Sequence, residues 1–116
     1  MDAYNANPTS MRSAIESFTL IDHPAKLAIL GDMYELGADS ALEHKSIIEL
    51  IESESFNCYF VGSNFDKEKT NKSTRIQFFK TKDEIKLELK KLALKGHLIL
   101  LKGSRGVGLE DLVEIL

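Results

Sequence analysis

The sequence has little of several residues on which whole classes of protein depend. Its one cysteine, Cys58, excludes an internal disulfide and a Cys-x-x-Cys metal site, so the reducing cytosol is the expected compartment. Its apolar runs, such as 98–101, are far shorter than the roughly 20 residues of a spanning helix, so we expect no membrane insertion. Fifteen Lys and Arg against eighteen Asp and Glu give a net charge of −3, which argues against a nucleic-acid partner.

The sequence also lacks the phosphate-binding motif G-x-x-x-x-G-K-[ST]. A protein that uses a nucleotide without this loop needs much of its nucleotide machinery elsewhere. What is present is an ordinary globular composition, 43% hydrophobic and 28% charged, in 116 residues. This length is typical of one domain, so we expect residues 1–116 to form a single domain.

Short apolar runs alternate with amphipathic segments along the whole sequence. Strands are expected at 26–30, 58–61, 76–79 and 97–101. Helices are expected to begin near 8, 40 and 82, with a closing helix at 109–115 and a polar surface loop at 64–74. This alternation predicts an α/β fold, a Rossmann-like and mostly parallel sheet flanked by helices.

Capping residues support the three expected helix starts. Asn7 stands before a proline at the first helical position, the usual arrangement of an N-cap. The pairs Ser40–Glu43 and Thr81–Glu84 have the spacing of a capping box, in which each side chain binds the other residue's backbone N–H.

Ligands of parallel sheets bind beyond the carboxyl ends of the strands, so the loops expected there carry the candidate site. The segment 2–8 leads into a helix start, which favours an anionic group. In it, Asp2 can accept hydrogen bonds from two ribose hydroxyls, and Asn5 and Asn7 can each donate to and accept from a purine or sugar edge. The alternative is an Asx turn followed by an N-cap.

The loop 31–37 follows the first predicted strand. Gly31 allows close approach of a backbone to a ligand, and Asp32 and Glu35 have the charge to bind a cation or an amine. The alternative is a plain strand-to-helix connection with solvated carboxylates. His44 lies beside an apolar stripe, and we expect it to pack rather than to catalyse.

The loop 102–108 follows the last predicted strand. Lys102 offers a point charge, Arg105 a planar fork of donors and Ser104 a hydroxyl, and three glycines expose backbone N–H groups. Such a set suits a carboxylate or a phosphate, although it is not a Walker loop. The alternative is a flexible surface loop.

Three strings carry a family resemblance: DAYNANPTSM at 2–11, LGDMYELG at 30–37 and LKGSRG at 101–106. Together, and in this order, they resemble the C-terminal domain of the Mur ligase family. Within that family they match the branch that joins D-Ala-D-Ala to UDP-N-acetylmuramoyl-tripeptide by way of an acyl phosphate. The resemblance spans nearly the whole sequence and implies a Rossmann-like domain of an ATP-dependent ligase of peptidoglycan precursor synthesis.

The resemblance also implies roles for single residues at the strand ends. Those expected to contact ATP are Asp2, Tyr4, Asn5 and Asn7. Those expected to contact substrate are Gly31, Asp32, Ser63, Asn64, Lys102, Ser104 and Arg105. Of these, Lys102, Ser104 and Arg105 would bind the carboxylate of either the acceptor or the tripeptide.

The same resemblance implies that the chain is part of a larger enzyme. An N-terminal UDP-binding domain and a central ATPase domain would precede it, and the central domain would hold most of the ATP and the Mg²⁺. In the family a strand precedes the first Asp, whereas Met1 directly precedes Asp2 here, so we expect the sequence to be a fragment. The alternative is a stand-alone receiver- or flavodoxin-like binding module. Lys102 fits a receiver, but no Asp follows the strand 58–61.

Overall fold

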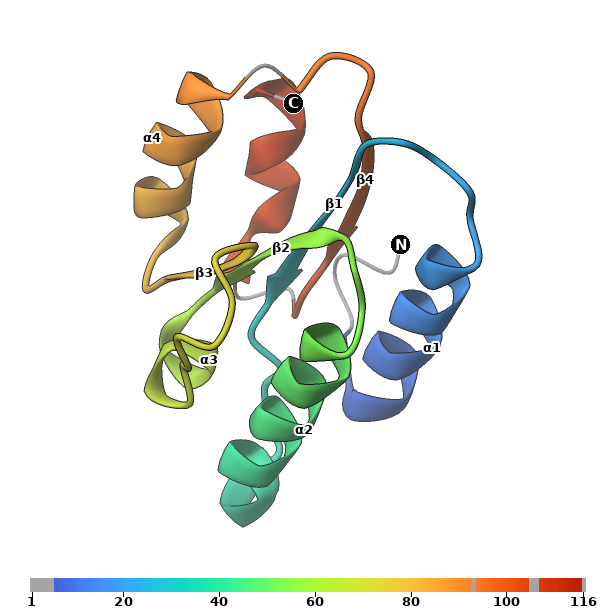
Figure 1. Ribbon diagram of the computed structural model, residues 1–116. Coiled ribbons are helices and arrows are strands. Elements are labelled where there is room, and N and C mark those ends of the chain that lie inside the picture. The colour runs from blue at the N-terminus through green and yellow to red at the C-terminus, as the bar shows by residue number, and fades with distance from the viewer. Residues whose placement is uncertain (1–5, 93, 105–106, 116) are drawn as a thin grey trace.

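A computed structural model describes residues 6–92, 94–104 and 107–115 (Figure 1). The strands are β1 (Lys26–Gly31), β2 (Asn57–Val61), β3 (Ile76–Phe79) and β4 (Leu98–Lys102). The α-helices are α1 (Pro8–Thr19), α2 (Ser40–Glu52), α3 (Ser63–Lys67) and α4 (Lys82–Lys91), and the 3₁₀ segments are η2 (Gly37–Asp39) and η4 (Leu109–Ile115). No helix among these residues has the length and apolarity needed to cross a membrane.

The four strands form one sheet in the order β3-β2-β1-β4, and every pair is parallel. In the centre, Leu27 of β1 lies opposite Asn57 of β2 and Ile99 of β4. The predicted α/β class with a parallel sheet is therefore confirmed. Because all strands point the same way, their carboxyl ends meet at one edge, where ligands of such sheets bind.

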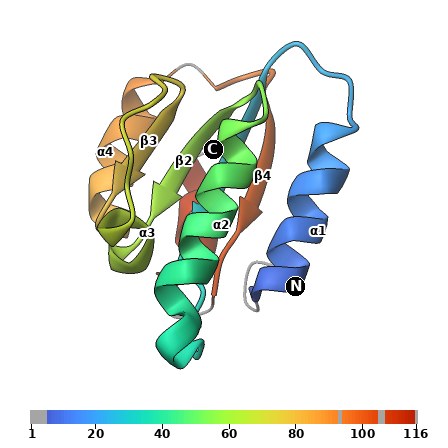
Figure 2. The ribbon, with the colours of Figure 1, turned by 60° about the horizontal axis from the view of Figure 1, so that its bottom comes forward.

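Helices cover both faces of the sheet, and strand side chains alternate between the two (Figure 2). The face under α1, α2 and α3 is built from Ala28, Leu30, Cys58, Phe60 and Leu100. The face under α4 and η4 is built from Leu27, Ile29, Tyr59, Val61 and Leu101. Cys58 is a core residue, as expected, and burial raises the pKa of its thiol well above the ordinary value.

The N-terminus of α1 has the predicted cap. Asn7 Oδ1 accepts a hydrogen bond from the Ser10 N–H at 2.9 Å, and Ser10 Oγ accepts one from the Asn7 N–H at 3.1 Å. At α4, Thr81 Oγ1 accepts from the Glu84 N–H at 3.2 Å, as predicted, but the Glu84 carboxylate accepts from the Lys80 N–H instead of returning to Thr81.

The predicted Ser40–Glu43 capping box is wrong. Ser40 is already the first residue of α2, and no side chain caps this helix start. The Ser40 hydroxyl instead lies 3.3 Å from Nδ1 of His44, one turn further along the helix. The preceding 3₁₀ turn η2 leads directly into α2, which leaves Ser40 no extended position from which to cap.

The predicted loop 64–74 is wrong at its start, where residues 63–67 form the short helix α3. Phe65 of this helix is fully buried, with its ring centroid 4.5 Å from that of Phe60 and 4.5 Å from that of His44. The hydrogen-bond acceptor that caps the helix is Asp32, which directly follows β1 and lies 32 residues before Asn64, so the residues around α3 carry no signal for it.

Two cations cap the carboxyl ends of helices from a distance. Lys26 Nζ donates to the carbonyl oxygen of Phe18, in the last turn of α1, at 2.7 Å and to that of Ile21, just beyond the helix, at 2.9 Å. The Arg75 guanidinium donates to the carbonyls of Ile51, Glu52 and Phe56, the first two in the last turn of α2. These bonds satisfy carbonyls that a helix end leaves open.

We expect Arg75→Ala to lower the free energy of unfolding by about 2 kcal/mol, because three carbonyls lose a charged donor. Urea denaturation followed by circular dichroism measures this. The control Lys45→Ala, at an exposed position on α2, should change stability by less than about 0.5 kcal/mol. Equal stabilities of the two variants would contradict the capping role.

Candidate functional site

The candidate site lies where the strands end, and two backbones pass very close together there. A Cβ at Gly103 would lie 2.9 Å from the Gly31 Cα and 2.8 Å from Cδ1 of Leu109. A Cβ at Gly31 would meet Val107 and Leu109 at 3.1 Å each. The space beside both glycines is therefore filled by the chain itself, and their missing side chains let the ends of β1 and β4 lie against η4.

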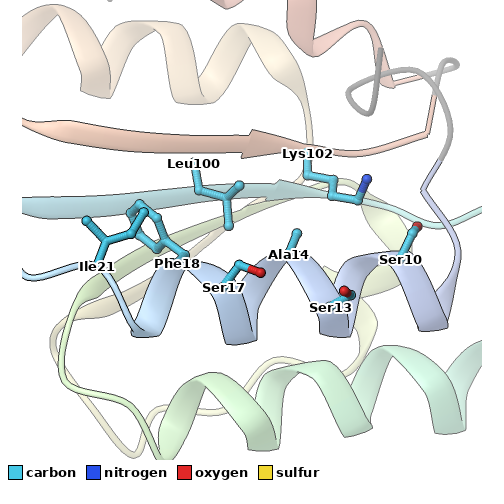
Figure 3. Close-up of a pocket in the computed structure, with 8 residues that line it drawn as sticks. All are labelled: Ser10, Ser13, Ala14, Ser17, Phe18, Ile21, Leu100 and Lys102. Carbon is cyan, nitrogen blue, oxygen red and sulfur yellow. The ribbon is translucent and has the colours of Figure 1, made fainter.

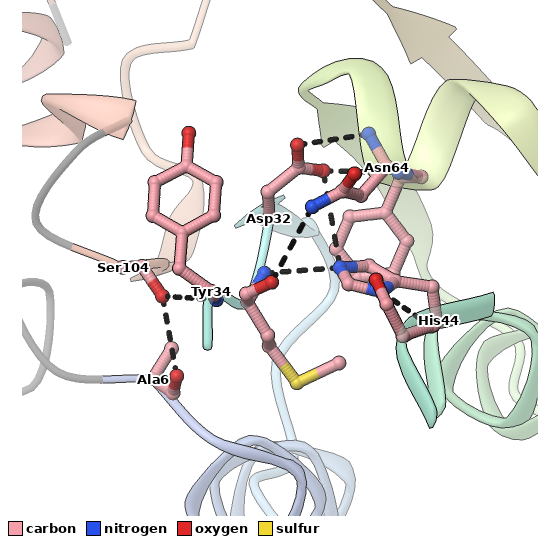
Figure 4. Close-up of polar contacts among 9 residues, drawn as sticks. Ala6, Asp32, Tyr34, His44, Asn64 and Ser104 are labelled. Atoms are coloured by element: carbon pink, nitrogen blue, oxygen red, sulfur yellow. Dashed lines mark hydrogen bonds and ion pairs between the residues drawn. The ribbon is translucent and has the colours of Figure 1, made fainter. Parts of the chain in front are cut away.

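Asp32, directly after β1, is the organising carboxylate of this edge (Figure 4). The residue is 1% exposed, and its two carboxylate oxygens accept hydrogen bonds from the N–H groups of Asn64 and Phe65, each at 2.9 Å. These amides belong to the first turn of α3, so Asp32 acts as the N-cap of a helix that follows a different strand. Burial raises the pKa of Asp32, and the two amide hydrogen bonds oppose that rise.

Gly62 is the residue that lets the Asp32 carboxylate reach α3. Its φ is +128°, and a Cβ at this position would lie 2.2 Å from the Cγ of Asp32. No other residue fits without moving the carboxylate. The residues Gly62-Ser63-Asn64 therefore shape the backbone around Asp32, and they are also candidates for ligand contact.

His44 supports the same loop from beneath. Its side chain is fully buried, Nδ1 donates to the Ser40 carbonyl at 2.7 Å, and Nε2 accepts from the Met33 N–H at 3.0 Å. These two bonds define a neutral ring with its proton on Nδ1. His44 is packed in the core, as expected, and it fixes the backbone next to Asp32.

Ser104 joins three of the predicted loops. Its hydroxyl donates to the Ala6 carbonyl at 3.2 Å and accepts from the Tyr34 N–H at 3.1 Å, and its own N–H donates to the Asp32 carbonyl at 3.0 Å. The segment before α1, the loop after β1 and the loop after β4 are thus bonded through one side chain that is 8% exposed. The structure brings together the loops that the sequence singled out.

Lys102 ends β4 on the face covered by α1. Its side chain is 2% exposed and lines a cavity of about 410 Å³ between α1 and β4, which we call the α1 groove (Figure 3). The serines Ser10, Ser13 and Ser17 line the other wall, and Figure 3 shows the Lys102 side chain running along the groove toward Ser10. The groove therefore pairs one cation with a row of hydroxyls.

A second cavity, of about 200 Å³, lies between the ends of β1, β2 and β3, and we call it the Lys80 cavity. Its lining residues are Asp32, Tyr34, Val61, Gly62, Ser63, Lys80, Thr81, Lys82 and Val107. Asp32 and Ser63 were predicted, whereas Tyr34, Lys80 and Lys82 were not. The rule that ligands bind at strand ends could have found the two lysines, since Lys80 directly follows β3 and Lys82 begins the helix after it.

The other predicted contacts are placed as follows. Asn7 caps α1, and the Asn64 side-chain amide lies 3.5 Å from the Met33 carbonyl. Asp2, Tyr4, Asn5 and Arg105 lie outside the described residues. Among the described residues, no group of three or more His, Cys, Asp or Glu is placed to hold a metal ion.

Substitution of Gly62 by Ala should destabilise the chain by about 3 kcal/mol, from backbone strain plus the clash with Asp32. Gly37→Ala is the matched control, because Gly37 also has a positive φ, +59°, but its Cβ would meet nothing within 4 Å. It should cost only about 1 kcal/mol. Denaturation curves compare the two, and hydrogen exchange at Asn64 and Phe65 should accelerate in Gly62→Ala alone. If hydrogen exchange at Asn64 and Phe65 stays unchanged in Gly62→Ala, Gly62 is not the residue that lets the Asp32 carboxylate reach α3.

Replacing Asp32 by Asn puts an NH₂ group opposite one of two amide donors, so we expect a loss of about 1–3 kcal/mol near pH 7. Because the folded-state pKa of Asp32 is raised, the folded state binds the extra proton first as pH falls. The wild-type advantage over Asp32→Asn should therefore widen from about pH 7 toward about pH 4. Urea denaturation at several pH values measures the gap, with the exposed Asp22→Asn as control. A gap that narrows on acidification would contradict the raised pKa.

The parallel sheet, with glycines, a buried carboxylate and cations at its carboxyl edge, defines a Rossmann-like α/β domain. A family model described as "Mur ligase, glutamate ligase domain" matches residues 1–105, and the chain belongs to this family. Curated relatives named UDP-N-acetylmuramoyl-tripeptide–D-alanyl-D-alanine ligase match 97% of the chain, at 36% identity in Bacillus subtilis and 32% in Rickettsia prowazekii. The chain spans about a quarter, 26%, of the length of each.

Solved structures agree with the sequence relatives. MurF from Acinetobacter baumannii superposes with a TM-score of 0.82 at 30% identity, over 97% of this chain and 26% of that one. MurF ligase from Thermotoga maritima in complex with ADP gives a TM-score of 0.78 at 27% identity, over 98% and 26%. These matches favour a ligase domain over the alternative of a receiver- or flavodoxin-like module. Consistently, β2 ends at Val61 and is followed by Gly62, so no Asp stands in a receiver's phosphorylated position.

Proposed function

We propose that this chain is the C-terminal domain of a cytoplasmic, ATP-dependent ligase that adds D-Ala-D-Ala to UDP-N-acetylmuramoyl-tripeptide. The observation that carries the proposal is the match of 97% of the chain to relatives bearing that name. Residues 1–116 form one domain of the enzyme, and a UDP-binding and an ATPase domain precede it. The lack of a phosphate loop and of a metal-binding cluster in the described residues supports placing the Mg²⁺ in the ATPase domain.

ATP, when bound by the whole enzyme, supplies the phosphoryl group that activates the tripeptide carboxylate. This domain contributes one wall of the site. Asp2, Tyr4, Asn5 and Asn7 contact the nucleotide in this proposal, and the Asn7 cap supports it by fixing the segment at the start of α1. The ADP-bound relative with the same fold supports the use of ATP.

The remaining proposed residues position the two peptides. Gly31 and Asp32 face the reacting peptide end. Lys102, Ser104 and Arg105 hold a carboxylate, and Ser63 and Asn64 join them. The Asp32 and Ser104 hydrogen bonds support this role indirectly, because they hold the loops after β1, β2 and β4 in one arrangement. Fixed loops matter for amide formation, since orienting an amine against an activated carboxyl supplies much of the rate. A wall that excludes water also protects the acyl phosphate from hydrolysis.

A coupled ADP-release assay tests the proposal. The full-length enzyme should release ADP only when UDP-N-acetylmuramoyl-tripeptide, D-Ala-D-Ala and ATP are all present, and mass spectrometry should find the pentapeptide product. The 116-residue chain alone should show no turnover, because it holds one wall of the site. Turnover by the isolated chain at an ordinary ligase rate, or turnover of the full enzyme without D-Ala-D-Ala, would overturn it.

A further inference from the structure

We propose that the Lys80 cavity binds the terminal carboxylate of the acceptor dipeptide, with Lys80 as its cation. The inference rests on the proposed function. It deepens that function by giving the carboxylate of the acceptor dipeptide and the carboxylate of the tripeptide separate binding places. The acceptor's carboxylate goes to the cavity beyond β1, β2 and β3, and Lys102, Ser104 and Arg105 are left for the tripeptide carboxylate.

The sheet itself separates the two cationic positions. Side chains alternate along β4, so Leu100 and Lys102 lie on the face covered by α1, while Leu101 packs on the opposite face with Val107. The Lys80 cavity is lined by Val61 and Val107, which belong to that opposite face. Lys102 and Lys80 therefore line different cavities.

The charges around the cavity suit a single negative charge. Lys82 is ion-paired with Asp111, and both oxygens of Asp32 accept backbone N–H groups. Lys80 is exposed, and its ammonium makes no ion pair with any residue in the described part of the chain. One uncompensated cation beside a buried carboxylate favours a carboxylate ligand over a doubly charged phosphate.

The walls fit a small peptide end. At about 200 Å³ the cavity is smaller than the roughly 300–1,000 Å³ of drug-sized sites, so it takes a carboxylate with a methyl side chain and little more. Gly62 leaves one wall without a side chain, and Val61 and Val107 are apolar. The hydroxyls of Ser63 and Tyr34 are available donors. Burial raises the pKa of the Tyr34 phenol, which keeps its proton at neutral pH.

Steady-state kinetics on the full-length enzyme test the inference. Lys80→Ala should raise the KM for D-Ala-D-Ala about tenfold, the loss of one charge-assisted hydrogen bond, and leave the KM for ATP and for the UDP-tripeptide within twofold. Lys80→Arg should restore most of the affinity. Lys90→Ala, at an exposed position on α4, is the matched control and should change no KM.

The C-terminal amide of D-Ala-D-Ala gives the second arm, since it lacks the carboxylate. Wild-type enzyme should bind this amide about tenfold more weakly, and Lys80→Ala should weaken its binding no further, as expected when two changes remove one interaction. A KM for D-Ala-D-Ala that Lys80→Ala leaves unchanged, or an equal loss for the acid and the amide, would overturn the inference alone. An unsubstituted enzyme that does not ligate D-Ala-D-Ala would overturn the proposed function instead.

Discussion

The hydrogen bonds from the Asp32 carboxylate to the first turn of α3 are the interaction on which the edge of this sheet depends. The carboxylate sits at the end of β1 and caps a helix that follows β2, so it fixes two neighbouring strand ends relative to each other. Its pairing with two amides makes burial of a charge tolerable, although burial still raises its pKa. Gly62 is the steric condition for this arrangement.

Two buried side chains, His44 and Ser104, hold the backbone around the Asp32 carboxylate by hydrogen bonds. His44 holds the Met33 N–H from one side, and Ser104 bonds the Asp32 carbonyl and the Tyr34 N–H from the other. Both side chains are buried and bond to the backbone, so they hold the loops after β1 and β4 in place. The two cavities at this edge add lysines and hydroxyls.

Much of the fold could be predicted, because the strands are short apolar runs and the caps at Asn7 and Thr81 are local signals. The sequence also located the right edge of the sheet, since Gly31, Asp32 and Ser104 all lie there. It could not reveal that Asp32 is committed to α3, because the partners are 32 and 33 residues away. Helix α3 could not be predicted either. Its capping residue is equally distant in the sequence, and its five residues are too few to show a periodic pattern.

Lys80 is hidden for a different reason. The capping pattern of Thr81 and Glu84 accounts for the residues after β3, and Thr81 does cap α4, yet its neighbours Lys80 and Lys82 also line a cavity. The local capping pattern therefore conceals the cavity. Asp32 is the reverse case, because its residue type suggests ligand contact and its contacts add the capping of α3.

The hydrogen bond from Ser104 to Ala6 joins residues 98 positions apart in a chain of 116. Contacts of such long range close late, because the intervening loop must first lose its freedom. During synthesis, the last strand leaves the ribosome after all the others, and only then can this bond form. The ligand-facing edge of the sheet is therefore closed only when the segment before α1 and the loop after β4 have come together.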